Sequence, residues 1–74
     1  MNESIDSHIK TIEDMVEELI GELKSLRKTA KNELGNHGEM TVSMYEKRVI
    51  KFKNDILVLR DSLDDNEYGD SYNI

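Results

Sequence analysis

The two histidines are the side chains best suited to acid–base or metal chemistry near neutral pH. They are His8 and His37. Helical bundles that bind metals place a histidine three residues after a glutamate on facing helices. Neither histidine follows a glutamate at that spacing, and the two lie far apart in the sequence. The pattern therefore predicts no metal site.

Nucleophilic and phosphate-binding chemistry is equally poorly supported. The six serines have no histidine and aspartate grouped around them in the sequence, and the chain contains no cysteine. The Gly35–Gly38 segment, Gly-Asn-His-Gly, lacks the lysine and serine or threonine that complete a phosphate-binding loop. We therefore predict a protein that is not an enzyme, needs no cofactor and binds no small-molecule substrate.

Acidic residues gather in one part of the N-terminal half. Glutamates four residues apart repel one another on a helix, so their accumulation indicates a basic partner or simply high solubility. Without a concave pocket, paired carboxylates are weak evidence for catalysis. The candidate acidic patch consists of Glu13, Asp14, Glu17, Glu18 and Glu22.

Basic residues gather in the middle of the chain. Such a cluster is typical of a site for phosphates or for an acidic protein, and equally of a solvated helix face. No aromatic residue lies in the expected connection for stacking on bases, which weakens an interpretation as a single-strand-binding protein. The candidate basic patch consists of Lys24, Arg27, Lys28, Lys31, Lys47, Arg48 and Lys51.

Apolar residues recur at alternating spacings of four and three, which is the heptad pattern of packed helices. From Ile5 to Ala30 the pattern predicts a first helix over about residues 4–34, and from Val42 to Leu63 a second helix over about 42–64. Two glycines and an asparagine within residues 35–41 predict a loop. We expect an all-α, coiled-coil-like antiparallel hairpin over 1–64, followed by a flexible acidic tail, 65–74.

The net charge alternates along the chain, which totals −6. Residues 1–23 carry seven acids and one lysine, residues 24–54 eight bases and three acids, and residues 55–74 six acids and one arginine. These blocks have net charges of −6, +5 and −5. In an antiparallel hairpin, the loop end should therefore be basic and the opposite end acidic.

The expected helices differ in length, so the start of the first helix should extend beyond the second. A second copy, the C-terminal tail or a foreign protein could cover this overhang, and we expect a homodimer that forms a four-helix bundle. A chain of 74 residues without disulfides usually gains stability from such association. The candidate dimer or partner interface consists of Ile5, Ile9, Ile12, Val16 and Leu19.

The longest apolar run has four residues, Ile56–Leu59, and the N-terminus does not resemble a signal peptide. We therefore expect a cytoplasmic protein without membrane contact. The leading hypothesis is a protein-binding adaptor or inhibitor, encoded by a phage or mobile element and directed at a host factor. The alternatives are a nucleic-acid-binding bundle that uses the basic loop end, and a coiled-coil subunit of a larger assembly.

Overall fold

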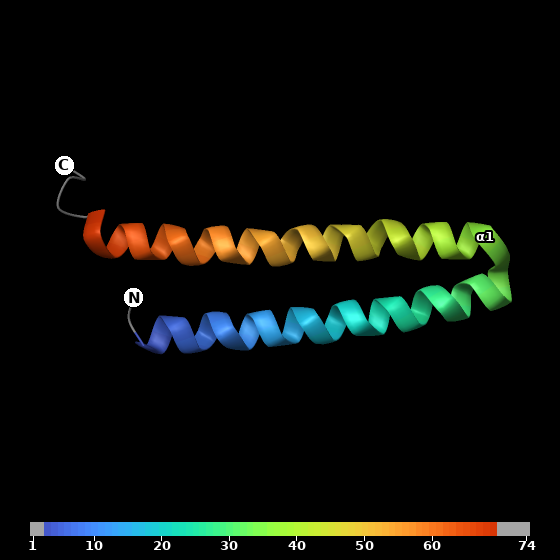
Figure 1. Ribbon diagram of the computed structural model, residues 1–74, viewed down its shortest axis with the longest axis horizontal. Helices are drawn as coiled ribbons and strands as arrows, with labels where there is room; N and C mark the ends of the chain where they lie inside the picture. The colour runs from blue at the N-terminus through green and yellow to red at the C-terminus, as the bar shows by residue number, and fades with distance from the viewer. Residues whose placement is uncertain (1–2, 70–74) are drawn as a thin grey trace.

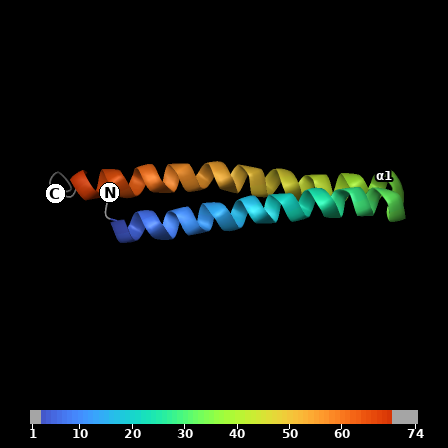
Figure 2. The ribbon, with the colours of Figure 1, turned by 60° about the horizontal axis from the view of Figure 1, so that its bottom comes forward.

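The computed structural model describes residues 3–69, which form one long, bent helix. This helix, α1 (Glu3–Gly69), has non-helical backbone angles at Gly35. Its two arms, residues 3–34 and 36–69, lie side by side and run in opposite directions (Figures 1 and 2). The molecule measures 56 × 22 × 9 Å. Over the described residues the structure has helix and no strand, so the predicted all-α class is confirmed.

Gly35 makes the turn between the arms by itself. Its φ of 76° and ψ of −159° lie in a region that is essentially restricted to glycine. The residues after it return at once to helical geometry, and the Thr41 hydroxyl donates a hydrogen bond to the His37 carbonyl oxygen at 2.9 Å. The loop predicted over 35–41 is therefore wrong: one glycine turns the chain, and residues 36–41 are helical.

Gly38 is one of the two glycines that predict the loop, but in the structure it has a packing role. It is buried, and a Cβ atom built on it would lie 2.8 Å from the carbonyl oxygen of Ala30 and 2.7 Å from the Cβ of Leu34. Ala30 is itself buried, at 6% exposure. Small residues on both arms thus allow a close backbone approach next to the bend.

The second arm begins earlier and ends later than the sequence pattern predicts. It starts directly after Gly35 and continues to Gly69, so the arms have nearly the same length. The predicted overhang of the first arm is therefore wrong. Of the tail expected at 65–74, residues 65–69 continue the helix, and residues 70–74 lie outside the part of the chain that the structure describes.

The core between the arms is a single narrow stripe. Its cluster contains Ile9, Val16, Ile20 and Ile56, against which Ile5, Val49 and Leu63 pack half-buried. The apolar face that the heptad pattern gives each arm is broader than this stripe. Each arm has only one neighbour, which can cover only part of so wide a face. Three heptad positions of the first arm, Ile12, Leu19 and Leu26, are consequently left 37–51% exposed.

Candidate interaction surface

Ion pairs between the arms line one side of the core stripe. Lys53 pairs with Glu17, and Arg60 Nη2 lies 3.0 Å from Glu13 Oε1. Arg60 Nε also lies 3.9 Å from Asp6 Oδ1. These contacts join residues 36 and more positions apart, and together they fix the register in which the arms lie.

A fourth cross-arm pair lies nearer the bend and is more deeply placed. Arg27 Nη1 approaches Glu46 Oε1 to 3.3 Å, and the Glu46 side chain is only 7% exposed. The same oxygen accepts no hydrogen bond, so the contact is ionic and not a well-aligned hydrogen bond. A buried carboxylate without a cation beside it would be strongly destabilising, so Arg27 is needed where it lies.

Large apolar side chains line the opposite side of the core stripe. On each arm they recur every seven residues, with Ile12, Leu19 and Leu26 on the first and Tyr45, Phe52 and Leu59 on the second. Their exposed fractions range from 37% to 52%. We call these six residues the apolar face; Met15, 64% exposed, lies on the same stripe of the first arm.

The helical period places the two rows on the same side of the molecule. Each row precedes a row of buried or half-buried residues by four positions: Leu19 precedes Leu23, and Phe52 precedes Ile56. Antiparallel helices are related by an approximate two-fold axis perpendicular to their common plane. Two rows that lie at the same angle from the core row of their own arm therefore lie on the same side of the molecule. The paired residues Glu17 and Lys53 lie one position after Val16 and four after Val49, on the other side.

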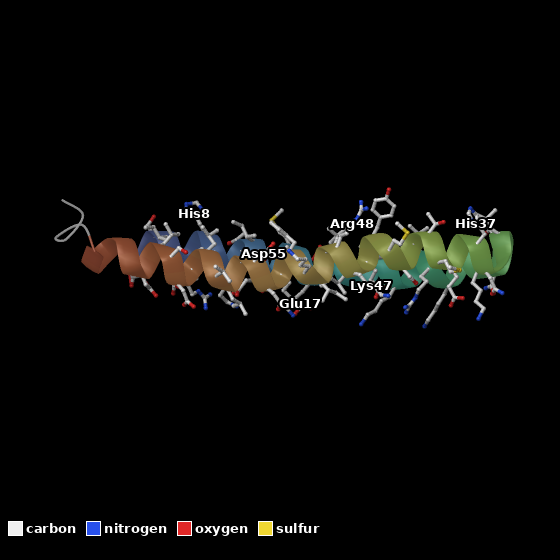
Figure 3. The ribbon with its side chains drawn as sticks, turned by 90° about the horizontal axis from the view of Figure 1, so that it is seen from above. His8, Glu17, His37, Lys47, Arg48 and Asp55 are labelled. Atoms are coloured by element: carbon white, nitrogen blue, oxygen red, sulfur yellow. The ribbon has the colours of Figure 1, made fainter. Side chains whose placement is uncertain are left out.

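Figure 3 shows this division through the residues that it labels. His8, four residues before Ile12, points to one side together with Arg48, while Glu17 points to the opposite side. The Arg48 guanidinium lies over the Tyr45 ring, 4.9 Å from its centroid, so it marks the rim of the apolar face.

The rows also match in height along the molecule. Ile12 and Leu59 immediately precede the ion-paired Glu13 and Arg60. Leu26 and Tyr45 immediately precede Arg27 and Glu46. Leu19 and Phe52 lie beside Glu17 and Lys53. The apolar face is therefore a ladder of three rungs, each beside an ion pair on the far side of the core.

The predicted interface residues are divided between the core and this ladder. Ile9 and Val16, at 3% and 6% exposure, are covered by the second arm, and Ile5 packs half-buried against the core. Ile12 and Leu19 remain exposed at 37% and 47%. The overhang expected to carry Ile5, Ile9 and Ile12 does not exist, because the second arm reaches further than the sequence pattern predicts.

The predicted basic patch is partly used within the molecule. Arg27 pairs with Glu46, and Lys31 Nζ lies 3.7 Å from Glu39 Oε1. Arg48 stacks on Tyr45. Within residues 3–69, no ion pair is made by the four remaining lysines, Lys24, Lys28, Lys47 and Lys51.

The predicted acidic patch is also divided. Glu13 and Glu17 pair across to the second arm, whereas Asp14 lies 3.8 Å from Lys10 on its own arm. Glu18 and Glu22 are exposed and make no ion pair among the described residues. The expectation of a free acidic surface therefore applies to these two residues, whereas Glu13 and Glu17 join the two arms.

Sequence reasoning missed four of the six ladder residues, because only Ile12 and Leu19 belong to the predicted interface. Leu26, Tyr45, Phe52 and Leu59 belong to the heptad pattern but to no predicted site, and neither Arg60 nor Glu46 belongs to a predicted charged patch. The signal was available: heptad rows in the two arms at equal distances from one turning residue must lie opposite each other. Placing that turn at Gly35 instead of over 35–41 would have revealed it.

Residues 3–69 show neither a metal site nor a membrane span. Among residues 3–69, no group of three or more histidine, aspartate or glutamate side chains is placed to hold a metal ion. The helix that these residues form has no stretch long and apolar enough to cross a membrane. No model of a protein family matches the chain, and no curated protein or solved structure is significantly similar to it.

Proposed function

We propose that this chain is a non-enzymatic protein-binding module, a small adaptor or inhibitor, which acts as an antiparallel helical hairpin through its apolar face. The observation that carries the proposal is the ladder of six half-exposed apolar side chains on one side of the molecule. Contiguous apolar patches of this kind mark interaction sites in soluble proteins, whereas single exposed apolar residues do not.

The form of the ladder indicates what it binds. Two parallel rows with a seven-residue repeat match the way in which helices pack in bundles, where each row fits between side chains of a facing helix. A pair of helices on the face would complete a four-helix bundle. A partner that offers apolar residues at the same spacing therefore fits better than an extended peptide or a flat surface.

The energetics favour an occupied face. Full burial of a large apolar side chain contributes about 1.5–3 kcal/mol, so each half-exposed rung residue has about 1 kcal/mol left to gain. Within residues 3–69, four large apolar side chains form the buried cluster. That is a small core for ordering so many residues, and a partner on the apolar face would enlarge it.

The proposal is tested with the double variant Leu19→Ser/Phe52→Ser, which removes the central rung. Both side chains are about half-exposed, at 47% and 52%, so the helix should still form. Partners retained from extracts of the native host are identified by mass spectrometry for the wild type and the variant. We expect proteins held by the wild type to be lost from the variant.

The matched control is Leu57→Ser/Val58→Ser, which also removes two exposed apolar side chains, at 47% and 62%, outside the apolar face. Circular dichroism of both variants shows whether the helix content is kept. Equal retention of the same proteins by both variants would contradict the proposal.

A second candidate function is supported by the unpaired lysines. Lys24 and Lys28 lie four residues apart on the first arm, and Lys47 points to the same side as Glu17, away from Arg48 (Figure 3). These side chains could bind the phosphates of a nucleic acid. Such binding would weaken steeply with salt, by about one logarithmic unit of slope per phosphate, and would be abolished by reversing the charge of these lysines.

A further inference from the structure

We propose that the apolar face is covered by a second copy of this chain, which lies antiparallel on it, so that the bend of each copy lies beside the arm ends of the other. The inference rests on the proposed function, because it names the occupant of the same face.

The face has the symmetry that a contact between identical copies requires. Its central rung, Leu19 and Phe52, lies seven residues from each outer rung on both arms. A two-fold axis through that rung, lying across the two arms, superposes the ladder on itself with the bend reversed. Ile12 of one copy then faces Leu26 of the other, and Leu59 faces Tyr45, which is the self-complementarity of a two-fold dimer.

Charge selects this orientation over the one in which both bends lie together. Residues 24–54, at the bend end, carry a net charge of +5. At the other end, residues 3–23 carry seven acids and one lysine, and residues 55–69 five acids and one arginine, for net charges of −6 and −4. The antiparallel arrangement places +5 against −10 twice, whereas the parallel one places like charges together. Packed helices lie about 8–10 Å apart, which is close to the screening length at moderate salt, so these charges interact and the interaction weakens as salt is added.

The rim of the face repeats this complementarity locally. Arg48 lies over Tyr45 at the rim, and Asp55 follows it by seven residues on the same stripe. Neither makes an ion pair among the residues that the structure describes. Phe52 lies on the two-fold axis, between Arg48 and Asp55 in the sequence. The axis therefore brings Arg48 of each copy level with Asp55 of the other copy, which gives two such pairs in the dimer.

Single cysteines test the arrangement cleanly, because the chain has none of its own. We would prepare Leu19→Cys and Phe52→Cys separately, oxidise each at low concentration and measure the covalent dimer on non-reducing gels. In the antiparallel dimer each residue faces its own counterpart at the axis. We expect each variant to cross-link to itself almost completely, with helix content preserved.

Ser25→Cys is the matched control. Ser25 is exposed and lies two residues after Leu23, about 200° around the helix from the core, so its side chain lies on the outer flank of the first arm, outside the apolar face. Little cross-linking is expected there, and equal cross-linking of the control would overturn the proposal. Cross-linking found only in a mixture of the two face variants would show the parallel arrangement and would also overturn it.

Light scattering of the wild type gives an independent measurement. We expect twice the chain mass of 8.6 kDa, and a dissociation constant that rises several-fold as salt screens the opposed charges. A monomer, or association that strengthens with salt, would overturn the inference. If the wild type is monomeric but loses its partners in Leu19→Ser/Phe52→Ser, the inference fails and the proposed function stands. If the wild type is monomeric and the variant retains every partner, both the inference and the proposed function fail.

Discussion

The two long sides of the paired arms differ, although they flank the same core stripe. On the charged side, Glu17 pairs with Lys53 and Glu13 with Arg60, so ion pairs between the arms are formed within the chain. On the other side, the ladder from Ile12 to Leu59 finds no comparable cover and stays 37–52% exposed. Folding thus pairs the charges on one side, and on the other it leaves exposed the apolar face through which we propose that association occurs.

The difference shows that register and stability come from different residues. Exposed ion pairs contribute about 0–1 kcal/mol each, so they stabilise the arms little but disfavour misaligned pairings. The apolar face can contribute more, but only when something covers it. The ion pairs of the charged side therefore set the register that places the two residues of each rung of the ladder opposite each other.

The largest loss of stability is expected from a substitution in the core, which supports both the charged side and the apolar face. Ile56 is 2% exposed and lies in the core between them. Ile56→Ala leaves a cavity there and should lower the free energy of unfolding by about 2–5 kcal/mol. Urea denaturation followed by circular dichroism measures this change, and we expect the ion pairs and the ladder to be lost in one transition.

Leu57→Ala is the control for Ile56→Ala. The neighbouring side chain is 47% exposed and belongs to neither the core cluster nor the apolar face. Its removal should change the free energy of unfolding by less than about 1 kcal/mol. Similar losses for the two variants would mean that the core does not lie where the structure places it.

The next effect is expected at the bend, which sets the height of every rung and ion pair. The Cβ of Gly38→Ala would meet the Ala30 carbonyl oxygen at 2.8 Å, and backbone cannot move aside as a flexible side chain can. The arms must separate locally, at a cost of about 1–3 kcal/mol. Thermal unfolding gives the loss, and the association constant shows whether the ladder is misaligned as well.

Gly21→Ala gives the matched comparison with the opposite sign. Gly21 is helical and exposed, and nothing lies within 4 Å of a Cβ built on it. Alanine should stabilise the helix by about 1 kcal/mol and leave association unchanged. A loss of stability here would indicate that Gly21 is a hinge or a contact point, which the geometry does not support.

The heptad pattern allowed the helices and the broad apolar stripe to be predicted, because 3.6-residue periodicity is a local property of the sequence. The place of the turn could not be read in the same way. Gly35, Asn36 and Gly38 all favour turns locally, and only the packing of Gly38 on Ala30 shows that the helix resumes after Gly35.

That error of a few residues propagated to the candidate site. A second arm that starts at 42 is too short to cover Ile5, Ile9 and Ile12, which the sequence pattern therefore leaves without a neighbour. Starting it at Asn36 covers Ile9 and leaves Phe52 beside Leu19 on the surface. Burial depends on register, and register depends on contacts between residues far apart in the chain, which a periodic pattern does not contain.

The smallest expected effect isolates the charged side from the apolar one. Glu17 and Lys53 have side chains 56% and 40% exposed, so their pairing is largely solvated. A double-mutant cycle with Glu17→Gln, Lys53→Gln and both together should give a coupling of about 0.2–1 kcal/mol that decreases with salt. Glu18→Gln is the control, since Glu18 makes no ion pair among the described residues and its substitution should change nothing.

We expect the association constant for the apolar face to stay within about twofold in the Glu17 and Lys53 variants, because neither side chain lies on that face. A large loss of association from these substitutions would show that the two sides do not act separately, and that the pair supports the ladder as well as the register.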